Sequence, residues 1–160
     1  MPQSAFIMHD AELKEINSVI EKLLTEANAK CVYLVDKDGQ LIASSGETKD
    51  IDSTSLASLT AGNIAATGGL AKLIGEKEFS ILFHEGERDN LHISVVGGRV
   101  ILVVIFDKRS SLGLVRLRVR KASEEVNNTI QRLLERMRSG AGKEHLLEEI
   151  SDDDIERLFT

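Results

Sequence analysis

The stretch SLASLTAGNIAATGGLAKLIG, from Ser55 to Gly75, decides how the rest of this chain is interpreted. Its spacing predicts a helix with two distinct faces. One face is an apolar stripe with a single polar break, formed by Leu56, Leu59, Asn63, Ala66, Leu70 and Leu73. The other face carries very little side chain and is formed by Ala57, Ala61, Ile64, Ala65, Gly68 and Gly69.

This bare stripe comes with a loss of helix propensity. A glycine inside a helix costs roughly 1 kcal/mol relative to alanine, and this segment contains Gly62, Gly68 and Gly69. Small residues in a helix allow another backbone to come close. That backbone belongs either to the helix's own sheet or to another chain. Because broken local rules cluster at functional sites, both explanations stay open at this point.

The composition limits what the chain can be. Its 160 residues suit one domain with a tail, and 42% hydrophobic residues are enough for a core. The formal net charge of −6 and the 4% aromatic content argue against nucleic-acid binding. Cys31 is the only cysteine and opens an apolar run, which favours a buried, inert thiol. No signal peptide or membrane-spanning run is present, so we expect a cytoplasmic protein without membrane insertion.

The first half of the chain predicts a helix followed by a hairpin. Apolar residues at helical spacing extend from Asp10 to Ala29. Two short apolar runs, Cys31 to Val35 and Gln40 to Ser44, flank an Asp-Gly turn and predict a β-hairpin. Asp52 or Ser53 can cap the following helix, which we expect to end near Gly75.

The second half predicts three strands and a long helix. Strands are expected at Phe79 to His84, around Leu91 to Val95, and at Val100 to Phe106. The last of these, VILVVIF, is apolar throughout, which is typical of a central strand covered on both faces. In the next segment apolar and basic residues at first alternate, as they would in a strand. Apolar residues at helical spacing extend over a longer stretch, which favours a helix from Ser111 to about Arg138.

The predicted order is therefore α-β-β-α-β-β-β-α. Tight turns join neighbouring strands, so we predict an α/β fold of the α+β type, with a five-stranded antiparallel sheet and helices on both faces. We assign residues 1–138 to this domain and 139–143, SGAGK, to a flexible linker.

Residues 144–160 form an acidic C-terminal tail. Ser151 and Asp154 match a helix-capping pattern, and the short helix it predicts has an apolar face of Ile155, Leu158 and Phe159. So short a helix is marginal alone. It is either a frayed tail or a segment that folds on a partner, and in the second case these three residues form a second partner contact.

No convincing active site, cofactor site or metal site emerges, so we expect no catalytic residue and no cofactor. His84 and His92 lie on adjacent predicted strands near Glu85, but surface histidines explain this better than a metal site does. Few polar residues interrupt the predicted core strands, so we expect no lined pocket for a small molecule. A basic cluster on the last helix favours a solvated face, with contact to an anion or an acidic tail as the alternative; it comprises Arg116, Arg118, Arg120 and Lys121.

Four stretches give the chain a strong resemblance to a known family. They are CVYLVDKDGQLIASSG at Cys31 to Gly46, SLASLTAGNIAATGGLAKLIGEKEF at Ser55 to Phe79, GGRVILVVIFDKRSSLGLVRLRVRKASEEV at Gly97 to Val126, and the acidic ending EEISDDDIERLF. Together they resemble the Roadblock family and, within it, the MglB type. The resemblance covers nearly the whole chain.

The resemblance implies a Roadblock fold and a homodimer. In this family the third strands of two copies join edge to edge, and the second helices lie side by side as a platform for small Ras-like GTPases. MglB-type proteins stimulate GTP hydrolysis by MglA, a GTPase that sets polarity in bacteria with surface motility, which implies concentration at a cell pole. The platform residues here would be Ala57, Ala61, Ile64, Ala65, Gly68, Gly69 and Lys72.

Two routes could accelerate the partner's hydrolysis. In one, an inserted arginine stabilises the transferring phosphate, and the candidates are Arg88, Arg99 and Arg109, all in predicted turns. In the other, the protein only holds the partner's switch loops in their catalytic arrangement. The family resemblance implies the second route, and a stripe of Ala and Gly has no reach into an active site. A scaffold that tethers a GTPase or a polar complex without changing hydrolysis is the alternative.

Overall fold

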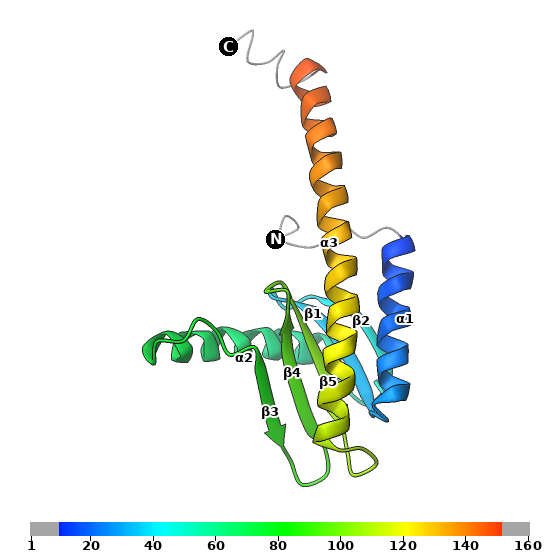
Figure 1. Cartoon of the computed structure of the whole chain (residues 1–160), viewed down its shortest axis with the longest axis vertical. Coiled ribbons are helices and arrows are strands. Elements are labelled where there is room, and N and C mark those ends of the chain that lie inside the picture. The colour runs from blue at the N-terminus through cyan, green and yellow to red at the C-terminus, as the bar shows by residue number, and fades with distance from the viewer. Residues whose placement is uncertain (1–9, 152–160) are drawn as a thin grey trace.

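The computed structural model describes residues 10–151, with side chains described up to residue 139. Its element order confirms the predicted α-β-β-α-β-β-β-α arrangement (Figure 1). The elements are α1 (Asp10–Glu26), β1 (Cys31–Asp36), β2 (Leu41–Gly46), α2 (Ser53–Leu73), β3 (Ile81–Glu85), β4 (Asn90–Val96), β5 (Val100–Phe106) and α3 (Leu112–Ser151).

The five strands form one antiparallel sheet in the order β2-β1-β5-β4-β3. The apolar run VILVVIF occupies β5 at the centre, and all seven of its residues are buried, as the sequence predicts. Leu102 and Val104 belong to the core on one face of the sheet, whereas Ile101 and Val103 belong to the core on the other. The outer strands β2 and β3 each have one unpaired edge.

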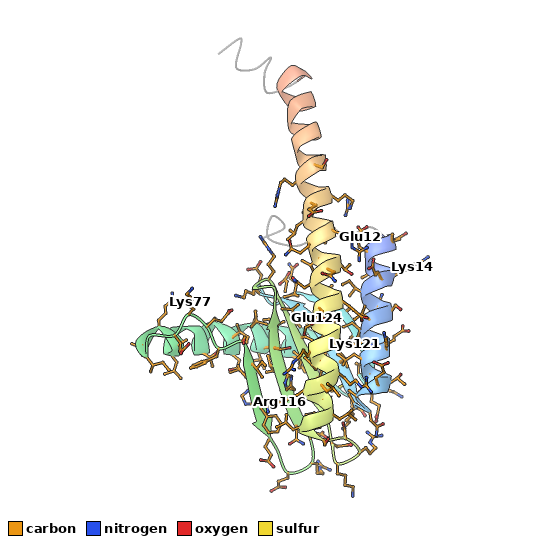
Figure 2. The ribbon with its side chains drawn as sticks, in the orientation of Figure 1. Glu12, Lys14, Lys77, Arg116, Lys121 and Glu124 are labelled. Carbon is orange, nitrogen blue, oxygen red and sulfur yellow. The ribbon has the colours of Figure 1, made fainter. Side chains whose placement is uncertain are left out.

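Helices cover both faces of the sheet. The helices α1 and α3 pack against each other over one face, and α2 lies on the opposite face (Figure 1). Three ion pairs link α1 to α3 in the described residues: Glu12 accepts a 2.7 Å hydrogen bond from Arg136, Glu15 accepts one from Arg132, and Lys22 lies 3.4 Å from Glu125. Figure 2 shows Glu12 on α1 beside α3.

The helix α3 is longer than the sequence predicts. It continues without a break to Ser151, so the segment 139–143 is helical in the structure and not a flexible loop. Glycine lowers helix propensity by about 1 kcal/mol but keeps its backbone N–H donor, and the residues around Gly140 and Gly142 include good helix formers such as Ala, Lys and Leu. The predicted short helix with Ile155, Leu158 and Phe159 lies outside the described residues.

Candidate functional site

The helix α2 is fixed at its N-terminus by a side-chain cap. Asp52 accepts a 3.1 Å hydrogen bond from the backbone N–H of Ser55 and a 2.7 Å hydrogen bond from its hydroxyl. These bonds lower the pKa of Asp52 below its ordinary value. The turn between β1 and β2 packs under the same end of the helix, because a side chain on Gly39 would come within 3.3 Å of the Ser58 backbone. The start of α2 is therefore anchored to the sheet.

The first half of α2 packs on the sheet. Ala57 is fully buried and Ile64 is 6% exposed, and both belong to the core formed with β1, β4 and β5. These two members of the predicted partner surface therefore face their own chain. Ala61 is half-buried beside them.

The second half of α2 extends past β3 and leaves the sheet (Figure 1). Here the predicted stripe is more accessible: Ala65, Gly69 and Lys72 are exposed, and Gly68 is half-buried. One stripe thus changes along its length from a packing surface to an accessible surface. The reason is that the helix is longer than the part of the sheet that it covers.

Three glycines of α2 have no packing role against the described part of the chain. A Cβ atom built on Gly62, Gly68 or Gly69 would meet no atom within 4 Å. Elsewhere a glycine is required: a Cβ on Gly46 would lie 2.5 Å from the Lys30 carbonyl oxygen. Packing within residues 10–139 therefore gives no reason for the glycines of α2.

Large apolar side chains accompany these glycines on the surface. Leu59 is 73% exposed, Leu73 is 83% exposed and Leu70 is 53% exposed. The neighbouring edge strand β3 also exposes Ile81 and Phe83, but their partners in the β3–β4 ladder, Ser94 and His92, place both side chains on the face of the sheet opposite to α2. Sequence reasoning assigned the partner surface to the small residues and missed these leucines. The sequence contained a signal for them, because Lys72 is the only charged residue of α2. A helix that is apolar on all sides must be buried by a second surface besides its own sheet.

The polar break in the leucine stripe ties α2 to the edge strand. The Asn63 amide nitrogen lies 3.1 Å from Nε2 of His84 on β3. His92 does not join them, because His84 pairs with Leu91 in the β3–β4 ladder and successive residues point to opposite faces. The two histidines cannot share a metal ion. Among the described residues no three His, Cys, Asp or Glu side chains are grouped as metal ligands.

Cys31 is buried at the start of β1, as the sequence predicts. Burial raises the pKa of its thiol to about 11, so the group stays protonated at neutral pH.

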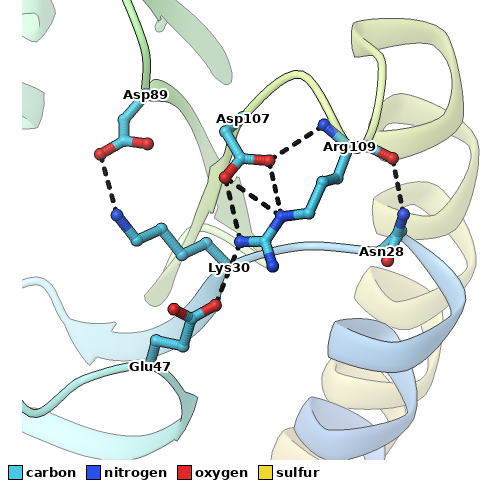
Figure 3. A network of polar contacts seen from close by, with 6 residues as sticks. All are labelled: Asn28, Lys30, Glu47, Asp89, Asp107 and Arg109. Atoms are coloured by element: carbon cyan, nitrogen blue, oxygen red, sulfur yellow. Dashed lines mark hydrogen bonds and ion pairs between the residues drawn. The ribbon is translucent and has the colours of Figure 1, made fainter.

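The three candidate arginines differ in their surroundings. Arg109 donates to both carboxylate oxygens of Asp107 at 2.9–3.2 Å and to Glu47 at 3.1 Å, in a network that also holds Lys30 and Asp89 (Figure 3). Arg88 and Arg99 are exposed and have no ion pair within the described part of the chain. They lie in the β3–β4 and β4–β5 turns, at opposite ends of the sheet.

Comparison with known proteins identifies the family. Residues 15–106 match the Roadblock/LC7 domain, so this chain belongs to the Roadblock/LC7 family. None of the helices in residues 10–151 has the length and apolar character needed to cross a membrane.

Solved structures narrow the resemblance to the MglB proteins. MglB of Myxococcus xanthus is 61% identical, with a TM-score of 0.76 over 79% of this chain and 96% of that one. The gliding protein MglB of Thermus thermophilus is 34% identical, with a TM-score of 0.76 over 80% and 97%. A third structure, described as MglB with a tetrameric arrangement, is 32% identical, with a TM-score of 0.77 over 81% and 97%.

Proposed function

We propose that this chain is a homodimeric regulator that binds a small Ras-like GTPase of the MglA type and stimulates its GTP hydrolysis. It has no active site of its own in this proposal; it orders the partner's switch loops and thereby controls cell polarity and motility. The likeness to MglB proteins supports the choice of partner.

The observation that carries the proposal is the combination of bare glycines and exposed leucines on α2. Gly62, Gly68 and Gly69 face open space, and Leu59, Leu70 and Leu73 are more than half exposed. Exposed apolar surface of this kind marks an interaction site. Glycines let a partner backbone approach closely, and the leucines supply apolar area to bury.

The edge strand β3 supports self-association. Among residues 10–151 its backbone pairs only with β4, and its Ile81 side chain is 50% exposed beside Phe83. An unpaired apolar edge is a template for pairing with another strand. Pairing between the β3 edges of two copies would place two α2 helices on the same face of one continuous sheet, which doubles the apolar surface offered to a GTPase.

The contacts of Arg109 argue against its donation to a partner's active site. The Arg109 guanidinium is already bound by Asp107 and Glu47, so its insertion elsewhere would break both ion pairs. Moving switch loops from mostly inactive to mostly active needs roughly 3 to 5 kcal/mol of differential binding. An apolar interface on α2 can supply that amount.

The test is a pair of substitutions on the exposed half of α2, Ala65→Arg and Gly69→Arg. Both positions are exposed in the folded chain, so the circular dichroism spectrum and Tm should stay near those of the unchanged protein. We expect GTP hydrolysis by the MglA-like GTPase of the same genome to fall to its unstimulated rate. Gly113→Arg on α3 is the matched control, since it is also an exposed helical glycine with no neighbour within 4 Å.

Full stimulation by both α2 variants would refute the docking surface. The scaffold alternative is tested with the unchanged protein. A scaffold would bind the GTPase without raising its rate of GTP hydrolysis. Single Arg88→Ala, Arg99→Ala and Arg109→Ala variants test the arginine route. A loss of about a hundredfold or more in the stimulated rate, with binding intact, would establish an inserted arginine.

A further inference from the structure

A cleft of about 640 Å³ lies on the face of the sheet opposite to α2, between α3 and the strands β3 and β4. Its volume is in the range of small-molecule sites. The sequence predicts no lined pocket, because few polar residues interrupt the predicted core strands. The side chains that matter for its chemistry are Ile81, His92, Ser94, Arg116, Val119 and Arg120.

The floor of the cleft contains buried polar groups without partners. His92 is 1% exposed and Ser94 is 5% exposed, and both lie on β4. Among the residues that the structure describes, neither ring nitrogen of His92 and no atom of the Ser94 hydroxyl group has a hydrogen-bond partner. Buried polar atoms are nearly always satisfied in native proteins, so an unpaired imidazole and an unpaired hydroxyl on one strand require an explanation.

Two cations stand on the α3 wall of the same cleft. Arg116 and Arg120 are four residues apart, so they project from the same side of the helix one turn apart. Neither forms an ion pair within residues 10–139, whereas Arg132 and Arg136, further along α3, pair with Glu15 and Glu12. Figure 2 shows Arg116 near the start of α3, beside the sheet.

His92 adds a neutral group and not a third charge. Burial, and then the nearby Arg116, lowers the pKa of its imidazole below the ordinary value. A neutral imidazole offers one N–H donor and one acceptor nitrogen. The cleft therefore combines two cationic donors and one carboxylate, Glu124, on its α3 wall with uncharged hydrogen-bonding groups at its floor and apolar surface from Ile81 and Val119.

We propose that this cleft binds a small organic anion, whose phosphate or carboxylate group is held by Arg116 and Arg120 and whose uncharged part reaches His92 and Ser94. Guanidinium groups one helix turn apart can share the oxygens of a single anionic group. The apolar wall selects an organic anion over a bare inorganic one. The site lies on the face opposite to α2, so it does not depend on the proposed GTPase contact.

The test uses three probes on the full chain: phenyl phosphate, benzoate and inorganic phosphate, at constant ionic strength set with sodium chloride. The readout is the His92 imidazole and the backbone amides of β4 and α3 in two-dimensional NMR. We expect saturable shifts confined to the cleft, with phenyl phosphate or benzoate binding about fivefold or more tightly than inorganic phosphate because it buries an apolar ring. The tighter of the two aromatic probes identifies phosphate or carboxylate as the preferred group.

Charge-reversal variants distinguish binding at the cleft from general electrostatic attraction of an anion to the protein. Arg116→Glu and Arg120→Glu should each weaken binding of the preferred aromatic probe about tenfold or more. Lys121→Glu is the matched control, because it makes the same charge change on an exposed residue of α3 that does not line the cleft. Equal weakening by Lys121→Glu would show only diffuse attraction and would overturn the proposal.

Replacement of the buried imidazole tests the floor. His92→Leu removes two unsatisfied nitrogens, so it should raise the Tm of the ligand-free chain. The same substitution should weaken binding of the preferred aromatic probe about fivefold. A lower Tm with unchanged affinity would mean that His92 serves the fold through ordered water only. Shifts that do not saturate, or that sodium chloride reproduces, would also refute the site.

Discussion

The two faces of the sheet are covered in different ways. On one face, α1 and α3 lie side by side over a core of large side chains such as Ile16, Ile20 and Leu133, and ion pairs connect the two helices. On the other face a single helix, α2, buries mainly small residues, Ala57 and Thr60, together with Ile64, while Ala71 is buried in the half of α2 that extends past the sheet. The apolar side chains that α2 leaves uncovered are large: Leu59, Leu70 and Leu73.

This contrast separates stability from association. Burial of apolar area against the same chain stabilises the fold, and the α1–α3 face supplies most of it. Apolar area left exposed stabilises nothing until another chain covers it. The two faces should therefore respond differently to truncation of a large apolar side chain.

The largest expected effect is the loss of a core side chain on the α1–α3 face. Ile130→Ala removes a side chain that is 2% exposed and should lower the free energy of unfolding by about 2–5 kcal/mol. The counterpart on α2, Leu70→Ala, should change it by about 0.5 kcal/mol or less in the isolated chain.

Urea unfolding at several chain concentrations measures both values. Loss through dissociation of a dimer depends on concentration, whereas loss of packing within one chain does not. A large, concentration-independent loss in Leu70→Ala would erase the distinction between the two faces.

A smaller effect with the opposite sign is expected at the glycines of α2. Gly62→Ala and Gly68→Ala add a methyl group that meets no atom within 4 Å, so each should stabilise the chain by about 0.5–1 kcal/mol through helix propensity. Each should also weaken stimulation of the GTPase, because the added methyl group separates two surfaces that come into contact.

Thermal and urea unfolding, run beside the GTPase assay, check this pair of opposite changes. Gly46→Ala is the contrasting variant, since its Cβ would lie 2.5 Å from a backbone carbonyl oxygen and φ is +97°. It should destabilise the chain. Stabilised α2 variants with undiminished stimulation would leave these glycines without a role in docking.

Much of the fold follows from local patterns in the sequence. The run Val100–Phe106 is apolar throughout because both faces of β5 are covered. The N-cap of α2 can be predicted because Asp52, a residue type that caps helices, directly precedes a segment with helical spacing. These features depend on neighbours along the chain. The continuation of α3 to Ser151 was missed because glycine and serine near residue 140 lower helix propensity without preventing helix formation.

The accessible part of the candidate site depends on relations that periodicity does not contain. The stripe of small residues looks uniform in the sequence, yet Ala57 is buried and Gly69 is exposed. The difference arises because α2 crosses the sheet and then extends past it. In the same way the alternation in β4 predicts that His92 and Ser94 share a face, but not that they are buried without partners under α3. Both facts need the relative placement of distant elements.

The smallest effect concerns the polar network at the loop end of the sheet, where Asn28, just after α1, donates a 2.6 Å hydrogen bond to the Arg109 carbonyl oxygen (Figure 3). The side-chain and backbone hydrogen bonds of Arg109 lower the pKa of Asp107 to about 2 from its ordinary value of 3.8. Because the folded pKa is the lower one, the stabilisation is complete above pH 4 and is lost as the pH falls toward 2. Arg109→Ala should raise the pKa of Asp107 only part of the way back, since residue 109 keeps the backbone N–H that donates to Asp107 at 3.0 Å. Carboxyl ¹³C titration by NMR measures this shift, and an unchanged Asp107 pKa would mean that the guanidinium does not hold the carboxylate in solution.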